Sequence, residues 1–312
     1  MALCLGINVP STTSRKVKTW KFASKFLWKN ATVQNKSELG RWVKHELLDL
    51  GPTFVKLGQI ASTRADLYPP EFTKELESLQ DDVPPVEIDI DVKYDIFKEF
   101  DPVPFKSASI GQVHMAALQN GQKVVVKIKR PRILDIMKED TDTIRGIVHF
   151  LERIGIDTGN SSGLVLDESI EYLLGEADYK REINNAIKFR KSMKDVDWVK
   201  VPKMYKKYSN DEMIVMEYVP SVKLTEITDK RVNKKKICEA LINAYVIQTM
   251  DNGLFHADPH PGNLGFSSKG QLVFYDFGLL VPLSEELRDG FTKLFRFIIT
   301  RDTAGIVDTL VK

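Results

Sequence analysis

Residues 255–278, FHADPHPGNLGFSSKGQLVFYDFG, decide the fold of this chain. Two prolines exclude a helix from the first part and hold an extended loop, which presents Asp258 and Asn263 on irregular backbone. After the loop, LGF and QLVFY can pair across the turn SSKG. Such a hairpin brings Asn263 and Asp276 together at its open end, although they are 13 residues apart.

The side chains at this end of the predicted hairpin are suited to phosphoryl transfer. The Asp276 carboxylate and the Asn263 amide oxygen, completed by water and phosphate oxygens, form a plausible Mg²⁺ site. Asp258 would lie close enough to orient or deprotonate an attacking hydroxyl or water. An Asp, an Asn five residues later and a strand-end Asp-Phe-Gly recur together in kinase-type active sites.

Two histidines in the same stretch have the spacing of a helical metal pair. His256 and His260 are four residues apart, but the prolines between and beside them remove the helix that such a pair requires. We therefore interpret His256 as a residue that steadies the loop.

A buried lysine is expected upstream, in the strand VVVKIKRP of residues 124–131. Lys127 is flanked there by apolar residues, so it needs an anionic partner. Glu182, in a long helix predicted over residues 167–193, is the candidate, and the pair would hold the phosphates of a nucleotide. An alternative stays open, because acids near a helix start also suit the helix dipole.

The segment before the lysine strand, PFKSASIGQVHMAA at residues 104–117, occupies the place of a phosphate-covering loop. Such loops carry several glycines, which let backbone N–H groups approach a phosphate, but this one has only Gly111. It is either a nucleotide loop with altered chemistry or a core hairpin. The candidate nucleotide contacts are Ala108, Ser109, Ile110, Gly111, Gln112, Val113 and Lys127, with the backbone of Glu217 and Val219 at a predicted hinge.

The predicted helix FVKLGQIAST places Lys56 and Gln59 on one polar stripe, while Gly58 permits close packing on another element. Lys56 is a candidate partner for Glu176 and Asp178, two acids near Glu182 whose like charges repel unless a cation lies among them. An ordinary amphipathic helix explains the same pattern.

The rest of the chain alternates between helical and strand patterns. We expect three helices over 40–85, short strands over 101–131 with a hairpin turn at Asn120-Gly121, a helix over 131–155, a Gly/Ser loop at 158–163, a strand over 212–220, and a buried helix over 234–253 that stops at glycine.

Composition limits the class of protein. The 312 residues are 43% apolar and 28% charged, as in globular proteins, and two cysteines cannot form a disulfide framework, which favours a reducing compartment. No apolar run approaches the roughly 18 residues of a spanning helix, so any membrane contact is expected to be peripheral.

Charge is distributed unevenly. Residues 1–37 contain seven Lys or Arg and no Asp or Glu, against 38 basic and 43 acidic residues in the remainder. Val17, Trp20, Leu27 and Trp28 can share a helical face among these lysines, as in a targeting peptide or a membrane-surface helix. The alternative is a basic helix that packs its tryptophans on the domain. Nucleic-acid binding is not expected, since the bias is local.

Together, the motifs KLGQ (56–59), SASIGQV (107–113), VVVKIKRP, EADYKRE (176–182), HADPHPGN and YDFG make the chain similar to the UbiB family of atypical kinases. The resemblance covers about residues 40 to 290 and implies an α+β, protein-kinase-like two-lobe fold with an N-terminal helical extension and a shortened C-lobe. The expected segments are 1–37, basic targeting or membrane-surface; 38–100, helical extension; 101–219, N-lobe with helical insertion; and 220–312, partial C-lobe.

The resemblance also implies roles for matching residues. Lys127 and Glu182 match the phosphate-binding lysine and its helix partner, Asp258 the catalytic-loop aspartate, and Asn263 and Asp276 the metal ligands. The signature lysine of the extension, which in the family lies over the peptide site and contacts a Glu-x-Asp pair, is matched by Lys56. The regulatory set is Lys56, Gln59, Glu176 and Asp178.

The expected cofactors are ATP and Mg²⁺, and the expected partners are an isoprenoid lipid or membrane surface and lipid-biosynthesis proteins. The family implies ubiquinone or plastoquinone metabolism in a mitochondrion, a plastid or at a bacterial membrane. A nucleotide-binding pseudokinase and a small-molecule kinase of the aminoglycoside or choline type are the alternatives. One departure is the loop, in which Lys106, Ser107 and Ser109 interrupt the family's run of alanines.

Overall fold

The computed structural model describes residues 12–64, 66–80, 85–86, 95–156, 162–224 and 234–311. The chain divides into two compact units, and the division passes through strands β3 (Gly111–Leu118) and β4 (Lys123–Lys129). Unit 1 comprises Met1–Asp95, Asp101–His114 and Lys127–Ala177; unit 2 comprises Ile96–Phe100, Met115–Val126 and Asp178–Lys312.

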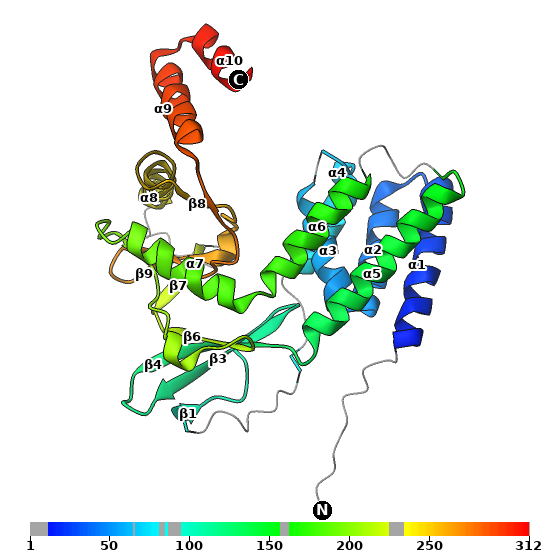
Figure 1. Cartoon of the computed structure of the whole chain (residues 1–312), viewed down its shortest axis with the longest axis horizontal. Coiled ribbons are helices and arrows are strands. Elements are labelled where there is room, and N and C mark those ends of the chain that lie inside the picture. Colours follow the sequence, from blue (N-terminus) through cyan, green and yellow to red (C-terminus); the bar gives the residue numbers. More distant parts are fainter. Residues whose placement is uncertain are drawn as a thin grey trace, which may run out of the picture. The chain divides into compact units, whose positions relative to one another are not determined.

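Unit 1 is built mainly from helices (Figure 1). They are α1 (Thr12–Thr32), α2 (Lys36–Leu50), α3 (Pro52–Thr63), α4 (Pro70–Glu77), the short η1 (Ser78–Gln80), α5 (Ile133–Arg153) and α6 (Ser162–Glu176), with strand β2 (Lys106–Ser107). The three helices predicted over 40–85 are confirmed as α2 to α4, and the helix over 131–155 as α5. Most of the predicted Gly/Ser loop at 158–163 lies outside the described residues.

Local signals explain where these helices begin and end. The side chain of Asn35 caps α2 by accepting hydrogen bonds from the backbone N–H groups of Ser37 and Glu38. Gly51, with φ of 100°, separates α2 from α3, whose first residue is Pro52. Close packing at Gly58 is confirmed, because a Cβ there would lie 2.6 Å from Cδ1 of both Leu47 and Leu79.

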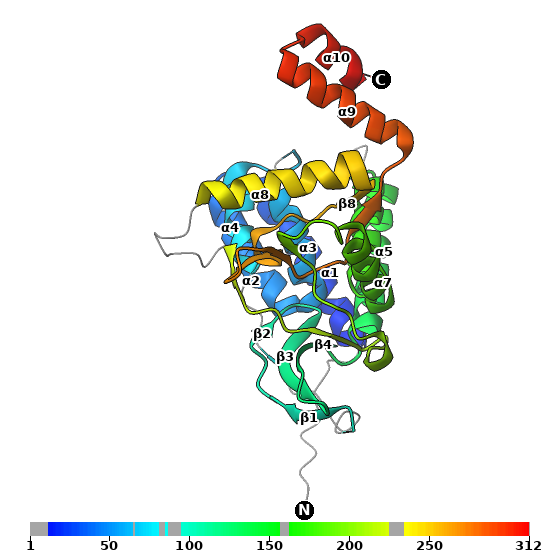
Figure 2. The ribbon, with the colours of Figure 1, turned by 90° about the vertical axis from the view of Figure 1, so that its left-hand side faces the viewer.

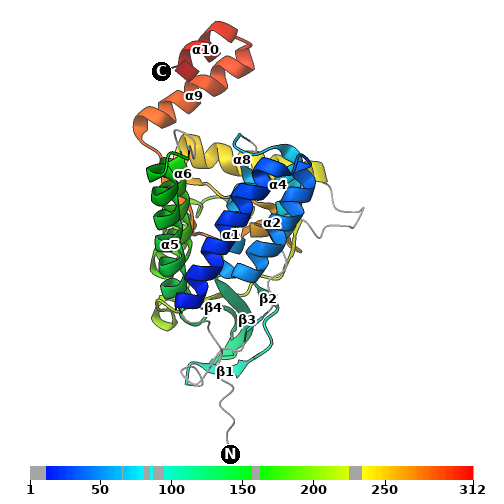
Figure 3. The same ribbon diagram turned by 90° about the vertical axis from the view of Figure 1, so that its right-hand side faces the viewer.

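Helix α1 packs beside α2 and α5 (Figure 3). Its inner side carries Phe22 and Phe26, which pack against the core of α2 to α4. Val17 and Trp28 are 47% and 65% exposed, so the expected alternative, in which this helix packs its tryptophans on the domain, is wrong for Trp28. Trp20 is also 40% exposed, although its ring contacts that of Phe150 edge-on at a centroid distance of 5.4 Å.

Unit 2 contains most of the strands. They are β1 (Phe97–Phe100), β5 (Val199–Lys200), β6 (Met213–Glu217), β7 (Ser221–Lys223), β8 (Leu254–His256), β9 (Leu264–Ser267), β10 (Leu272–Phe274) and β11 (Leu280–Pro282). The chain forms a sheet of order β1-β3-β4-β6 with β2 beside β3, a sheet of order β5-β10-β9-β7, and the pair β11-β8. The predicted turn at Asn120-Gly121 is confirmed, with Gly121 at φ of 80° between β3 and β4.

The helical segments of unit 2 are α7 (Tyr179–Ser192), η2 (Lys206–Tyr208), α8 (Lys234–Val246), the π-helical turn η4 (Ile247–Asn252), η5 (Pro261–Asn263), α9 (Glu285–Thr300) and α10 (Thr303–Val311). Helix α8 packs on η4 and β10, and α9 packs on η4. Figure 2 shows α10 beside α9, on which it packs. Among the residues that the structure describes, no helix has both the length and the apolar character needed to cross a membrane.

Two expectations about helices are corrected. The single long helix over 167–193 is two helices, because Asp178 accepts a hydrogen bond from Arg181 N at 2.9 Å and so caps a new helix, α7. The helix over 234–253 does end at Gly253 in the left-handed conformation, as predicted. It is not buried as predicted, since Ile237 and Ala244 are the buried residues of the described part of α8.

Candidate functional site

The loop after β8 holds Asp258 and Asn263 together. The Asn263 backbone N–H donates to the carbonyl of His260 at 2.8 Å, which closes the one-turn helix η5. The side-chain Nδ2 of Asn263 donates to Asp258 Oδ2 over 2.6 Å. Because the amide NH₂ group is turned toward Asp258, Oδ1 is the Asn263 atom suited to bind a cation.

The predicted hairpin is present, with β9 and β10 antiparallel and Leu264 paired with Phe274. One step further, Tyr275 N donates to Asn263 O at 3.0 Å, so the backbone of Asn263 lies opposite the residue that precedes Asp276. The Asp276 carboxylate is oriented in turn by a hydrogen bond from Gly278 N to Oδ1 at 2.9 Å. The hairpin therefore brings the two candidate metal ligands to one end, as the sequence predicted.

The donor set fits Mg²⁺. A carboxylate and an amide carbonyl are hard oxygen ligands, and a magnesium ion commonly takes one or two protein ligands and completes its octahedron with phosphate and water. Within the described ranges, no group of three or more His, Cys, Asp or Glu side chains is arranged to hold a metal ion. A Mg²⁺ site made by Asn263 and Asp276 and completed by a nucleotide therefore stays a prediction.

His256 steadies the backbone at this site, as we interpreted from the sequence. The ring is 1% exposed, and its Nε2 lies 2.7 Å from the backbone carbonyl of Asp276, to which an Nε2–H donates. The ring also packs against Phe189, Phe274 and Phe277. The histidine therefore fixes the backbone of Asp276, a candidate metal ligand.

Two residues near the loop escaped the sequence reasoning. Gln248, fully buried in η4, accepts the backbone N–H of His256 at 2.8 Å through its side-chain oxygen. Tyr245 has its pKa raised by burial and, to a smaller extent, by the negative charge of Asp258, so its hydroxyl stays protonated. A glutamine inside the apolar run AYVIQTM was the one available signal, since a buried amide needs a partner.

The acidic segment EADYKRE is divided between the two helices. Glu176 is the last residue of α6, Asp178 caps α7, and Glu182 lies 1% exposed in the first turn of α7. Asp178 and Glu182 remain one helical turn apart, because the Glu182 backbone N–H donates to the Asp178 carbonyl at 3.0 Å, and the Asp178 carboxylate accepts from Arg181 N. Because Lys127 belongs to unit 1 and Glu182 to unit 2, their pairing stays a prediction.

Within unit 1, Lys56 and Glu176 form the ion pair that the sequence predicted. Lys56 Nζ lies 2.6 Å from Glu176 Oε2, and both side chains are about one-fifth exposed, at 19% and 20%. Gln59 has a different contact, because its Nε2 donates to Leu79 O at 2.8 Å and ties α3 to η1. The regulatory role of these residues stays a prediction.

The residues of the predicted phosphate loop lie in the hairpin between β2 and β3. Ala108 to Ile110 form its turn, and Gly111 to Val113 begin β3. Ser109, Ile110 and Gln112 are 6%, 8% and 1% exposed.

At the predicted hinge, β6 ends with Glu217, whose carboxylate binds Lys200 Nζ at 2.7 and 2.9 Å. Burial favours a higher pKa for Glu217, but the hydrogen bonds from Lys200 and Lys203 N outweigh it and hold the pKa below its usual value. The backbone N–H of Glu217 donates to Lys203 O, and Val219 O accepts from Ser221 Oγ. These two backbone groups are therefore engaged within the chain, and the contact of this segment with an adenine edge stays a prediction.

A contact that the sequence did not reveal joins β7 to the residue before Asp276. The hydroxyls of Ser221 and Tyr275 lie 2.5 Å apart. The Tyr275 ring crosses Gly265 so closely that a Cβ there would lie 2.0 Å from the Tyr275 hydroxyl oxygen. Only glycine at position 265 leaves room for this ring.

Comparisons with known proteins find relatives over most of the chain. A sequence profile of the ABC1 atypical kinase-like domain matches residues 87–310. The protein ACTIVITY OF BC1 COMPLEX KINASE 8, chloroplastic, of Arabidopsis thaliana is 35% identical over 318 residues, covering 95% of this chain and 42% of that protein. The protein ACTIVITY OF BC1 COMPLEX KINASE 7, chloroplastic, of the same plant is 33% identical over 330 residues, covering 96% of this chain and 48% of that protein. The chain thus spans less than half the length of these two relatives.

A solved structure supports the same fold. Rv3197 of Mycobacterium tuberculosis, determined as a complex with erythromycin, is 27% identical with a TM-score of 0.57, over 69% of this chain and 55% of that one. The expected α+β, protein-kinase-like fold is therefore confirmed.

Proposed function

This chain belongs to the ABC1 atypical kinase-like family, which is the UbiB family that its motifs resemble, and we propose that it binds Mg²⁺-ATP as an atypical kinase or ATPase that supports prenyl-quinone lipid metabolism at a membrane. The observation that carries the proposal is the hydrogen bond between Asn263 and Asp258, at the end of the hairpin that also carries Asp276. The hydrogen bond holds Asp258, which can act on an attacking group, beside Asn263. The hairpin brings Asp276 to the same end, so the two oxygen ligands proposed for a metal ion come from neighbouring backbone.

Each residue has a distinct role in this proposal. Asn263 Oδ1 and the Asp276 carboxylate would hold Mg²⁺, which when bound neutralises the charge that develops on the phosphate oxygens. Asp258, held by the Asn263 amide, orients an attacking hydroxyl or water and takes its proton. Lys127 binds the phosphates and is held by Glu182, whose burial suits a paired role.

Turnover of ATP tests the proposal. We expect multiple-turnover, Mg²⁺-dependent phosphate release from the unmodified protein, and a loss of about 10²-fold or more in Asp258→Asn, since general acid–base groups contribute about that much. Asp276→Asn should abolish Mg²⁺-dependent nucleotide binding, because it removes the charged ligand. Asp289→Asn, an exposed aspartate on α9, is the matched control and should keep full activity.

The results separate the alternatives. Nucleotide binding without turnover in the parent would indicate a pseudokinase instead, and Mg²⁺-dependent binding that survives in Asp276→Asn would contradict the metal assignment. Repeating the assay with liposomes and a quinone-precursor mimic tests the proposed role in lipid metabolism. We expect faster phosphate release only when the liposomes and the mimic are both present.

The membrane part of the proposal is supported by the outer face of α1. Val17, Trp20 and Trp28 are exposed there, among lysines and without any acidic residue in positions 1–37. Aromatic and basic side chains on one face are typical of helices that lie on anionic lipid surfaces. The chloroplastic names of the two Arabidopsis relatives favour a plastid among the expected locations. Lipid-biosynthesis proteins remain proposed partners.

A further inference from the structure

The hairpin turn that would cover the phosphates has an ordinary backbone. Strands β2 and β3 pair Lys106 with Val113 and Ser107 with Gln112, and Ala108 N donates to Gly111 O at 2.9 Å. Residues 106–113 are all described, and none of them has a positive φ. The turn therefore does not need glycine for its conformation, which explains why alanine, serine and isoleucine are accommodated.

Side chains of the turn are anchored in unit 1. Ile110, 8% exposed, packs in an apolar cluster with residues of α5 and α6 and the segment that follows α6, namely Ile133, Met137, Leu173 and Ala177. Gln112 forms hydrogen bonds in both directions with the backbone of Val86, accepting from its N–H and donating to its carbonyl at 2.9 Å. A glycine-rich loop has no side chains with which to make such contacts.

Arg130, at the end of the lysine strand, contacts three residues of the turn. Its Nε donates to Ala108 O at 2.9 Å, its Nη2 to Ser107 Oγ at 3.0 Å, and its backbone N–H to Ile110 O at 2.9 Å. The residue is only 7% exposed, and this burial lowers the pKa of the guanidinium. A buried cation persists only where polar contacts compensate its lost hydration, and these hydrogen bonds contribute to that compensation.

We propose that Arg130 is a positioning residue that clamps the turn of residues 107–110 in its nucleotide-binding shape before any nucleotide arrives. The clamp replaces flexibility with preorganisation, since a loop already in its bound shape has less conformational freedom to lose on binding. The nucleotide part of this inference rests on the proposed function, whereas the clamp itself is a property of the free protein.

Amide hydrogen exchange of the free protein tests the clamp. Arg130→Met should raise the exchange rate of the Ala108 amide by about tenfold or more, because losing a hydrogen bond from a charged donor changes the opening equilibrium of the turn by about that factor. Arg130→Lys, which keeps the charge and one donor direction, should give an Ala108 exchange rate between those of Arg130→Met and the parent. Arg153→Met, an exposed arginine of α5, is the control and should exchange as the parent does.

Calorimetric titration with Mg²⁺-ATP and Mg²⁺-ADP then tests the positioning role. Arg130→Met should bind ATP about tenfold more weakly than the parent, with partial rescue in Arg130→Lys. Should Arg130→Met fail to fold, Ser107→Ala removes one acceptor without leaving a buried charge, and it should raise Ala108 exchange to a lesser degree.

Unchanged Ala108 exchange in the folded variants would overturn the clamp. Faster exchange with unchanged ATP affinity would overturn the positioning role. A parent protein that binds neither nucleotide would refute the proposed function and the nucleotide part of this inference, and the exchange data would then decide on the clamp alone.

Discussion

Single hydrogen bonds place the residues of the candidate site, and the contact between Tyr275 and Ser221 is the one most open to measurement. Their hydroxyls are 2.5 Å apart, and each residue is partly buried. Tyr275→Phe should lower the free energy of unfolding by about 1 kcal/mol, the net worth of one hydrogen bond, and Ser221→Ala by more, because it also removes the bond from Ser221 Oγ to Val219 O. Because both changes remove the bond between the two hydroxyls, the double variant should lose little more stability than Ser221→Ala alone, as measured by urea denaturation.

The double-mutant comparison supplies its own control. Additive losses in the double variant would show that the two hydroxyls do not depend on each other, and the proposed link between β7 and the segment before Asp276 would then be wrong. Thr300→Val, which removes an exposed hydroxyl bonded within α9, should change the stability by less than either site variant.

At the scale of elements, Gly58 determines how closely α3 packs. A Cβ at this position would lie 2.6 Å from the ends of Leu47 and Leu79, which are themselves buried at 6% and 2% exposure and have little room to move. Gly58→Ala should therefore destabilise unit 1 by about 1 to 3 kcal/mol, despite the better helix propensity of alanine. Thermal unfolding measures this loss.

Another helical glycine gives the matched control. At Gly146, in α5, a Cβ would meet no other atom within 4 Å, so Gly146→Ala should stabilise the protein by about 0.5 to 1 kcal/mol. Equal effects of the two substitutions would show that helix propensity, and not the close approach of α3 to its neighbours, governs position 58.

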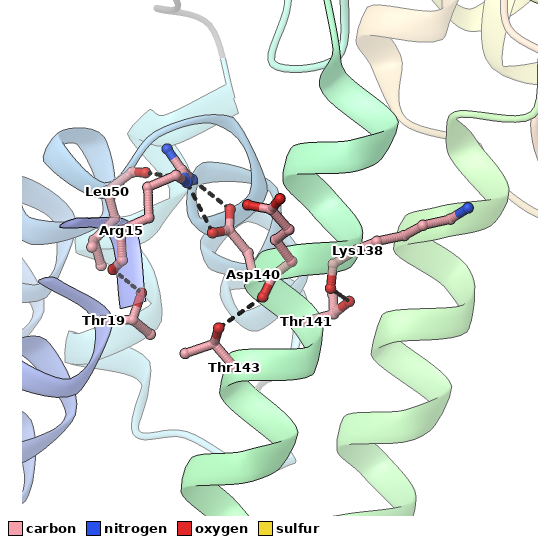
Figure 4. Close-up of polar contacts among 8 residues, drawn as sticks. Arg15, Thr19, Leu50, Lys138, Asp140, Thr141 and Thr143 are labelled. Carbon is pink, nitrogen blue, oxygen red and sulfur yellow. Dashed lines mark hydrogen bonds and ion pairs between the residues drawn. The ribbon is translucent and has the colours of Figure 1, made fainter. Parts of the chain in front are cut away.

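Ion pairs also join elements of unit 1, as Figure 4 shows for α1 and α5. Arg15 donates to both oxygens of Asp140, at 3.1 and 2.5 Å, and to the carbonyl of Leu50 at the end of α2 at 3.3 Å. Asp140 is 2% exposed, so it depends on this arginine for compensation of its charge. The inner side of α1 is thereby tied to the unit, and its outer lysines stay available to solvent.

For the molecule as a whole, that outer face predicts lipid binding. Lys18→Glu combined with Lys21→Glu should reduce binding to anionic vesicles by at least about tenfold, because each basic residue near such a surface contributes about 1 kcal/mol. Vesicle flotation at physiological ionic strength measures the loss. The pair Lys188→Glu and Lys191→Glu, exposed lysines with the same spacing on α7, is the control for net charge.

Equal losses in the two pairs would indicate nonspecific attraction, and unchanged binding in the α1 pair would contradict a membrane role for this helix. Trp28→Ser adds a test that is independent of charge. It removes the most exposed of the three apolar side chains on the outer face of α1. It should weaken binding to the same anionic vesicles although the charge of the protein is unchanged.

Local sequence sufficed for much of the site. The prolines around Asp258, the SSKG turn and the run from Leu264 to Tyr275 specify a loop and a hairpin, because turn residues and alternation act over a few neighbours. The Lys56–Glu176 pair was also predictable, since a partly buried cation requires an anion. The motifs further specified the family and its kinase-like fold.

Contacts between distant segments were decided only by tertiary structure. Whether Asp178 continues a helix or caps a new one, and whether Trp28 packs or stays exposed, depends on neighbours that helical periodicity does not identify. The same holds for Arg130 on the turn at Ala108, 22 residues away, and for Tyr275 across Gly265 to Ser221. Such hydrogen bonds depend on distances between folded elements, and residue order alone does not encode those distances.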